Sequence, residues 1–242
     1  HSAVVGVSEI ITLNRKSPGW SGDKYVLDEK YWSEVDRVMQ EKYNKSLTEV
    51  PFNLKASLPF YSLALQSNKE ALEAILEISK KSIISDASKN SKRLEVLLQS
   101  KSFKVRVIYL VRDGRAIVHA YLRKYKSCWP GLYNLISTDR AARRLMAKHG
   151  SKNWLTIRYE DMATDLEGTL RNICSFSKIN YESLMLHPDT SNFNGLGGNR
   201  LIKRPIDKII LDNVWQTEMP RITRSFTSII VSKFNRRHGY KN

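Results

Sequence analysis

The apolar and polar positions alternate along the chain between short β-type runs and amphipathic helical stretches. The β-branched and aliphatic runs, each short enough for a buried strand, are 3–7, 82–85, 105–111 and 154–159. Helical spacing of apolar residues predicts helices over 31–43, 69–80 (capped by Asn68), 91–98, 116–125, 139–149, 166–176 (capped by Asp165) and 209–234, the last broken at Pro220. The polar, Gly- or Pro-containing stretches predict loops at 14–30, 51–62 and 187–205, and a loop or lid at 126–138. Alternating strands and helices predict an α/β fold with a parallel sheet covered by helices.

The stretch 105–125, VRVIYLVRDGRAIVHAYLRKY, organises this pattern. The strand ends at Arg112, Asp113 suits the helix N-cap, and Gly114 allows the tight turn between them. Arg112 is therefore expected at the carboxyl end of a central strand, where open α/β sheets bind ligands. Its permanent charge and planar fork of donors suit a phosphate, and the alternative is a surface arginine that closes a strand.

Two later segments repeat this combination of charge and turn chemistry. The strand end 158–161 (RYED) carries Tyr159, which can stack on a base, or simply pack at the edge of the sheet. In the segment 197–204 (GGNRLIKR), glycines free the backbone amides to approach an anion beside three cations. The alternative for this segment is a solvated basic loop.

Composition narrows the class of partner. The 242 residues suffice for one domain spanning 1–242, and 40 Lys and Arg against 24 Asp and Glu give a net charge of +16. This excess predicts a polyanionic partner: a nucleotide, a sulfated or phosphorylated glycan, a membrane surface, or nucleic acid. Nucleic acid ranks last because the basic residues are not interleaved with aromatics on one stripe. No apolar run reaches the length of a membrane span, and no metal site is predicted from the scattered histidines and the two cysteines, Cys128 and Cys174. Cys174 is expected on the core face of its helix.

Together the segments resemble one family. IISDASK, VIYLVRDGRAIVHAYLRK, WLTIRYEDMATDLEGTLRNICSFSKI, GGNRLIKR and LDNVWQTEMPRITRSF follow one another as in sulfotransferases that use 3′-phosphoadenosine-5′-phosphosulfate (PAPS). The likeness runs from about Ile83 to the C-terminus and is closest to the broad carbohydrate and bacterial group. It implies a three-layer, P-loop-NTPase-like parallel sheet flanked by helices. It also implies transfer of a sulfuryl group from PAPS to a hydroxyl or amine of a carbohydrate or small molecule, with adenosine 3′,5′-bisphosphate as the product and no metal.

The resemblance also implies roles for individual residues. Arg112 matches the arginine that grips the 3′-phosphate of the donor, and Tyr159 matches the tyrosine that reaches the adenine. Ser88 and Lys89, in the D-x-S-K turn that begins at Asp86, match the acceptor side. The residues that match the loop closing over the nucleotide phosphates are Gly198, Asn199, Arg200, Lys203 and Arg204.

The chain departs from the family pattern at two places. In the family, a serine at the position of Ala120 donates a hydrogen bond to the 3′-phosphate together with the arginine. Here His119 or Arg123 can supply that donor instead. The glycine-rich loop for the 5′-phosphosulfate is not found, and 2–13 resembles the segment that follows it, so we expect the first strand–loop–helix unit to be missing from this chain. The alternative function is a non-catalytic sulfotransferase-like protein that binds a nucleotide or an acidic glycan. A P-loop kinase is disfavoured because GxxxxGK[ST] does not occur.

Two residues are candidates for the general base. Glu9 follows the first strand, and its alternative reading is an ordinary helix-start carboxylate. His119 shares a helix face with Arg115 and Arg123, which would favour its neutral form, and its alternative reading is a solvated helix histidine. The sequence does not name the acceptor. It favours a bacterial cytoplasm, with the Golgi lumen as the alternative if an N-terminal anchor has been removed.

Overall fold

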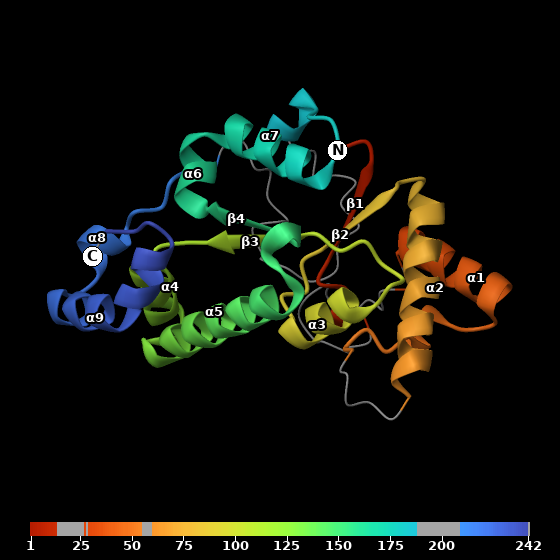
Figure 1. Cartoon of the computed structure of the whole chain (residues 1–242), viewed down its shortest axis with the longest axis horizontal. Helices are drawn as coiled ribbons and strands as arrows, with labels where there is room; N and C mark the ends of the chain where they lie inside the picture. Colours follow the sequence, from red (N-terminus) through yellow and green to blue (C-terminus); the bar gives the residue numbers. More distant parts are fainter. Residues whose placement is uncertain (14–26, 28, 55–59, 188–208, 242) are drawn as a thin grey trace. The chain divides into compact units, whose positions relative to one another are not determined.

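The computed structural model describes residues 1–13, 27, 29–54, 60–187 and 209–241 (Figure 1). Residue contacts divide the chain into two compact units. Unit 1 comprises His1–Lys104 with Glu182–Asp207, and unit 2 comprises Val105–Tyr181 with Lys208–Asn242. Each unit is described by itself below.

Unit 1 is built on a parallel pair of strands, β1 and β2, which pair from Val4 opposite Ile83 to Ser8 opposite Asp86 with a shift of register between Gly6 and Ser8. Its strands and helices are β1 (Val4–Ser8), the 3₁₀ turn η1 (Ile10–Thr12), α1 (Lys30–Tyr43), η3 (Leu47–Glu49), α2 (Tyr61–Ser79), β2 (Ile83–Asp86), α3 (Ser91–Gln99) and η5 (Ser183–Leu186). α1 and α2 lie side by side (Figure 1). Their apolar faces and β1 form one core that includes Trp32, Met39 and Ile75, all fully buried.

The predicted start of the second helix is wrong. α2 begins at Tyr61 rather than after Asn68, so Asn68 lies inside the helix and is buried. Its side-chain amide donates to the carbonyl oxygens of Pro51 (3.1 Å) and Ala64 (2.9 Å). An asparagine can satisfy backbone groups at a helix start or within a fold, and here it joins α2 to the segment before it.

Unit 2 is also built on a parallel pair, β3 with β4, in register from Val107 opposite Trp154 to Val111 opposite Arg158. Its strands and helices are β3 (Val107–Val111), α4 (Gly114–Tyr125), α5 (Trp129–His149), η4 (Ser151–Asn153), β4 (Trp154–Arg158), α6 (Tyr159–Thr164), α7 (Leu166–Ser177), α8 (Trp215–Glu218) and α9 (Arg221–Arg237). α6 and α7 lie on one side of the strand pair, and α4 and α5 on the other (Figure 1). A core that includes Val118, Val231 and Phe234 joins α4 and α5 to α9.

The predicted loop or lid at 126–138 is also wrong, because α5 begins at Trp129. Pro130 occupies the first helical turn, where a missing amide costs nothing. A Cβ on Gly131 would lie 3.0 Å from the Cβ of Tyr121 and 3.1 Å from the Cα of Val118. Proline and glycine therefore mark a helix start and a close contact with α4, not a loop.

The helix predicted over 209–234 begins only at Trp215, and the predicted loops at 14–30 and 187–205 lie almost entirely outside the described residues. Other expectations from the apolar pattern are confirmed. All four strands form within two residues of their predicted bounds, Asp113 and Asp165 cap α4 and α7, and Cys174 is buried on α7. The class is α/β with parallel strands, present as two two-stranded sheets in the described residues. None of the helices described here is both long and apolar enough to cross a membrane.

Candidate functional site

The register of unit 2 brings two of the predicted site residues together. Because Val111 pairs with Arg158, the residues that follow them, Arg112 and Tyr159, leave the same edge of the sheet. The Arg112 guanidinium carbon lies 4.5 Å from the centre of the Tyr159 ring. A cation on an aromatic face at the carboxyl ends of parallel strands is a site where an anion and a flat ring can bind side by side.

Arg112 is held by Asp212. One terminal nitrogen donates to the backbone oxygen of Asp212 at 2.6 Å and lies 3.0 Å from its carboxylate. Burial raises the pKa of the Asp212 carboxyl, but the hydrogen bond from Arg112 and the amide of Val214 outweigh it and keep this pKa below its usual value. The Nε atom of Arg112 is buried and has no hydrogen-bond partner among the described residues. Arg112 therefore carries one buried donor that no described residue satisfies.

The Tyr159 hydroxyl is already engaged with the chain. It donates to the backbone oxygen of Ile210 at 2.8 Å and accepts from the amide of Asp212 at 3.2 Å. These bonds place 210–212 beside the two strand ends, with Asp212 in reach of Arg112. The hydroxyl of Tyr159 is therefore engaged with the chain, and one face of its ring carries the Arg112 guanidinium.

Asp113 fixes the turn after Arg112. Its carboxylate caps α4 by accepting from the amide of Arg115 (2.9 Å), and it is ion-paired with the Arg115 guanidinium (2.6 Å). Asn235 of α9 donates to Asp113 at 3.2 Å and accepts from the amide of Gly114 at 2.9 Å. A Cβ at Gly114 would lie 2.9 Å from the Cβ of Val231, so only glycine fits this approach of α4 to α9.

Glu160, Asn235 and Tyr240 are structural residues of the site that sequence reasoning did not single out. The Tyr240 hydroxyl donates to Oε2 of Glu160 at 2.5 Å, and Oε1 of Glu160 accepts from the amide of Asp113 at 3.2 Å. Burial, and then the bond to Glu160, raise the pKa of Tyr240, so the phenol keeps the proton that it donates. The RYED motif and the LVRDGRA motif are thus hydrogen-bonded directly to each other, and Tyr240 holds the Glu160 carboxylate that makes this bond.

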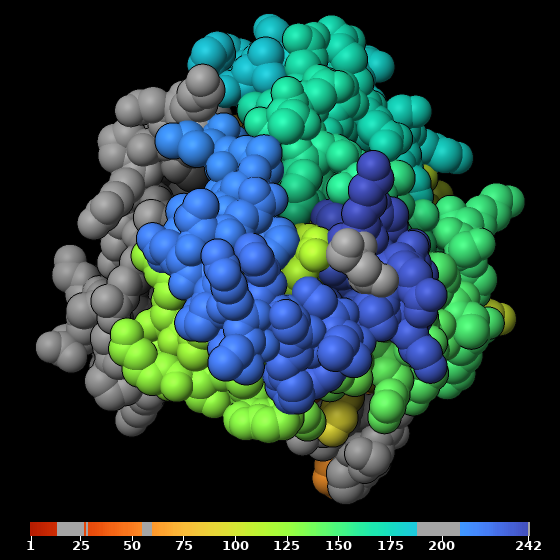
Figure 2. Space-filling model, turned by 90° about the vertical axis from the view of Figure 1, so that its left-hand side faces the viewer, coloured from red at the N-terminus to blue at the C-terminus, as the bar shows by residue number. Residues whose placement is uncertain are grey.

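A pocket of about 610 Å³ opens next to this turn, between α8 and α9 (Figure 2). Its walls include Arg115, Arg224 and Lys241, together with Trp215 and serines 225 and 228. The Arg115 guanidinium lies 4.6 Å from the centre of the Trp215 ring. This side of unit 2 is therefore basic and aromatic as well.

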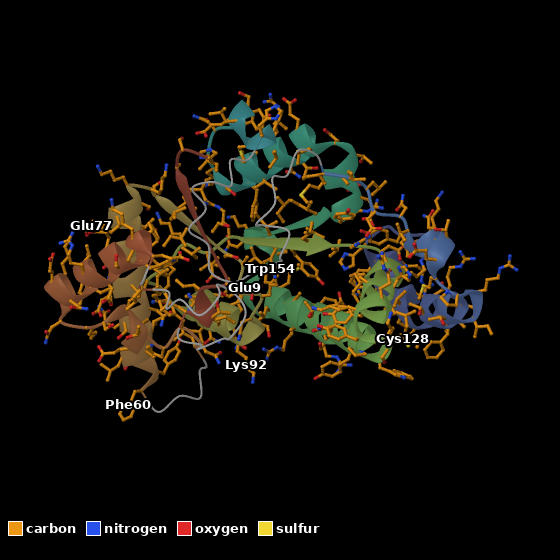
Figure 3. All side chains as sticks on the ribbon, turned by 180° about the vertical axis from the view of Figure 1, so that it is seen from behind. Glu9, Phe60, Glu77, Lys92, Cys128 and Trp154 are labelled. Carbon is orange, nitrogen blue, oxygen red and sulfur yellow. The ribbon has the colours of Figure 1, made fainter. Side chains whose placement is uncertain are left out.

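The strand ends of unit 1 bring together a second set of predicted residues: Glu9, Ser88 and Lys89. The Nζ atom of Lys89 lies 2.8 Å from Oε1 of Glu9, which is labelled in Figure 3. Ser88 donates to Asp86 at 2.5 Å, and Asp86 is ion-paired at 3.0 Å with Arg93. The fully buried Arg93 guanidinium thus fixes the turn that presents Ser88 and Lys89.

His119 belongs to unit 2, on α4, and is only 5% exposed, so the reading as a solvated histidine is wrong. Its neighbours on the helix face have acidic partners: Arg115 pairs with Asp113, and Arg123 lies 4.0 Å from Glu218. The predicted phosphate loop with Gly198, Asn199, Arg200, Lys203 and Arg204 lies outside the described residues.

Fold and site together define an α/β protein with a cationic, aromatic site at the carboxyl end of a parallel strand pair. A sequence profile described as "Sulfotransferase family" matches residues 27–183, a range that includes Ser88, Arg112 and Tyr159. The chain belongs to the sulfotransferase family, as its resemblance predicted. A comparison with curated proteins finds no match.

Solved structures with a related fold include two sulfotransferase domains. The domain from the curacin biosynthetic pathway is 14% identical, covers 100% of this chain and 90% of its own, and superposes with a TM-score of 0.55. The domain from the olefin synthase of Synechococcus PCC 7002 is 15% identical, covers 99% and 95%, and has a TM-score of 0.48. At these identities the curacin-pathway domain supports the fold alone.

Proposed function

We propose that the protein is a sulfotransferase that moves a sulfuryl group from PAPS to a hydroxyl or amine of a carbohydrate or small molecule. The observation that carries this proposal is the Arg112–Tyr159 pair at the ends of β3 and β4, contributed by the two motifs LVRDGRA and RYED. Family membership supports it independently. The finer architecture that we propose with it is the three-layer parallel sheet of this family, within a single domain 1–242.

Arg112 is proposed to bind the 3′-phosphate of the nucleotide. Its buried Nε offers one donor, and its terminal nitrogens offer more once Asp212 yields to the ligand. The ring of Tyr159, beside that charge, is proposed to take the adenine. Gly198, Asn199, Arg200, Lys203 and Arg204 are proposed to bind the remaining phosphate groups, and the net charge of +16 draws such a ligand in.

PAPS supplies an activated sulfuryl group, which the acceptor oxygen or nitrogen attacks in line as adenosine 3′,5′-bisphosphate leaves. The chain contributes positioning and charge to such a transfer. Ser88 and Lys89 are proposed to orient the acceptor at the end of β2. Between the two candidate bases we place Glu9 ahead of His119, because a base must reach the acceptor proton and the His119 side chain is only 5% exposed.

The test is a calorimetric titration with adenosine 3′,5′-bisphosphate and with 5′-AMP, on the wild-type chain and on Arg112→Ala. A lost charge-assisted contact costs about 1.5–3 kcal/mol, so we expect Arg112→Ala to weaken bisphosphate binding by about tenfold to a hundredfold and to leave AMP binding nearly unchanged. Arg106→Ala is the matched control, because Arg106 precedes the same strand at its opposite end.

Equal binding of the two nucleotides by the wild-type chain, or equal losses in both variants, would refute the 3′-phosphate site. If the site is present, an acceptor screen with PAPS follows, with Glu9→Gln as the variant that tests the base. Bisphosphate binding without turnover on any acceptor would favour the alternative, a nucleotide-binding protein of the same family.

A further inference from the structure

Two helices of unit 2 expose an apolar stripe each, and the stripes meet. We call these six residues the aromatic face: Trp129, Tyr133 and Ile136 on α5, with Ile222, Phe226 and Ile229 on α9. Their exposed fractions run from 40% for Phe226 to 88% for Ile222. Each set has the spacing i, i+4, i+7, which lines one side of a helix. The Trp129 and Phe226 rings join the two stripes, edge to face at 5.8 Å.

The aromatic face is not the core-facing side of these helices. α5 and α9 pack into unit 2 through other residues, among them Leu132, Leu135, Val231 and Phe234, which are buried. Single exposed apolar side chains are ordinary on protein surfaces, but six that form two joined stripes are not. Contiguous exposed patches of this kind mark surfaces that bind something.

The charge around the aromatic face is almost entirely positive. The segments 114–149 and 215–242 contain fourteen Lys and Arg and two acidic residues, Asp139 and Glu218, and Glu218 lies 4.0 Å from Arg123. Asp139 is buried and ion-paired with Arg143 and Arg237, so it adds no negative charge to the surface. α8 and α9 together with α4 form one side of unit 2 in Figure 2, and Cys128, labelled in Figure 3, marks the turn that leads into α5.

We propose that the aromatic face docks on an anionic lipid membrane, with α5 and α9 lying on the headgroup region. The bulky side chains protrude from helices instead of lining a groove, so they suit insertion into a fluid interface. Tryptophan and tyrosine favour the boundary between headgroups and acyl chains, and the surrounding Lys and Arg attract anionic lipids. No described helix can span the bilayer, so the contact is peripheral.

The charge and the apolar side chains of the aromatic face also make two other binding partners unfavourable. A second copy of this chain would bring two predominantly basic surfaces together, which is electrostatically unfavourable. Nucleic acid would satisfy the charge, but it offers no apolar phase for Ile222 and Ile229. This inference does not depend on the proposed nucleotide site, because none of the six residues contributes to it.

The test is co-sedimentation of the 242-residue chain with vesicles of phosphatidylcholine alone or with 30% phosphatidylglycerol, at about 0.15 M salt. The variant Ile222→Gln with Ile229→Gln removes two protruding side chains, and Leu184→Gln is the control because Leu184 is 78% exposed in unit 1. We expect binding to the anionic vesicles alone, weakened at least about tenfold by the double variant and unchanged by the control.

A second pair of variants tests the charge. Arg221→Gln with Lys233→Gln should weaken binding, whereas Lys92→Gln with Lys101→Gln, exposed in unit 1, should not. Absence of vesicle binding, or equal losses in test and control variants, would overturn the proposal. So would a wild-type dimer in analytical ultracentrifugation that Ile222→Gln with Ile229→Gln converts to a monomer. Titration with adenosine 3′,5′-bisphosphate should be the same for all these variants, which separates this inference from the proposed function.

Discussion

The Asp212 carboxylate is ion-paired with the Arg112 guanidinium, which we propose binds the 3′-phosphate. Removing the negative charge of Asp212 should therefore increase the affinity for the bisphosphate. In Asp212→Asn the backbone oxygen that accepts from Arg112 at 2.6 Å remains, and the amide oxygen can still accept from the Val214 amide. Only the carboxylate 3.0 Å from Arg112 is lost. The phosphate then no longer competes with an internal anion.

The size of the effect follows from the exposure of this ion pair. The Asp212 side chain is 48% exposed, and ion pairs in such positions contribute about 0.2–1 kcal/mol. Asp212→Asn should therefore tighten binding of adenosine 3′,5′-bisphosphate by up to about fivefold in a calorimetric titration. Binding of 5′-AMP should change less, because AMP carries no 3′-phosphate.

Asp161→Asn is the matched control, since it makes the same change in net charge and Asp161 lies 3.8 Å from Arg158, not Arg112. An equal gain in both variants would show that the effect is long-range charge. A loss of bisphosphate affinity in Asp212→Asn would show that Asp212 positions Arg112 for the ligand rather than competing with it, and would refute the reasoning.

Three further predictions concern unit 2, each measured by urea unfolding followed by tryptophan fluorescence. Gly114→Ala should lower the free energy of unfolding by about 1–3 kcal/mol, because the added Cβ meets a side chain of α9 at 2.9 Å; no loss would contradict that contact. Tyr240→Phe should lower it by about 1.5–3 kcal/mol, because a part-buried carboxylate oxygen of Glu160 loses its donor, and a neutral result would rule this bond out as a stabilising one. Burial lowers the pKa of His238 below 6.5 despite the opposing effect of Asp139, so below pH 6.5 the unfolded chain binds more protons. Stability should thus be full above pH 6.5 and fall as the pH decreases, and His238→Phe should flatten that slope.

Much of the fold could be predicted because its signals are local. Alternating apolar runs located all four strands, and the turn around Asp113 was predicted from one carboxylate before a helical pattern. The errors occurred where one residue type has two uses. Asn68 fits a helix cap by sequence but bonds inside α2, and Pro130 with Gly131 fits a loop by sequence but begins α5 and packs against α4.

The candidate site was predictable for the same reason, but only in part. Arg112 and Tyr159 each end a strand, and parallel pairing of those strands was enough to expect them at one edge. Their supports were not predictable, because Glu160 and Tyr240 are 80 residues apart and Asn235 and Asp113 are 122 apart. Pairs at such separations have no periodicity or motif spacing that a single sequence can reveal.

Two of the supports that escaped prediction, Asn235 and Tyr240, lie at or just after the end of α9. Asn235 donates to the carboxylate of Asp113 and accepts from the amide of Gly114, so α9 fixes both the Asp113 side chain and the backbone that follows it. Tyr240 fixes the backbone of the same turn indirectly. Its hydroxyl holds the Glu160 carboxylate, which accepts a hydrogen bond from the amide of Asp113. Arg112 precedes this turn directly, so its backbone is positioned by residues more than 120 positions away before a ligand arrives. Affinity gained by such preorganisation needs no contact with the ligand. It also gives α9 two separate tasks: one side sets the geometry beside Arg112, and the other exposes Ile222, Phe226 and Ile229.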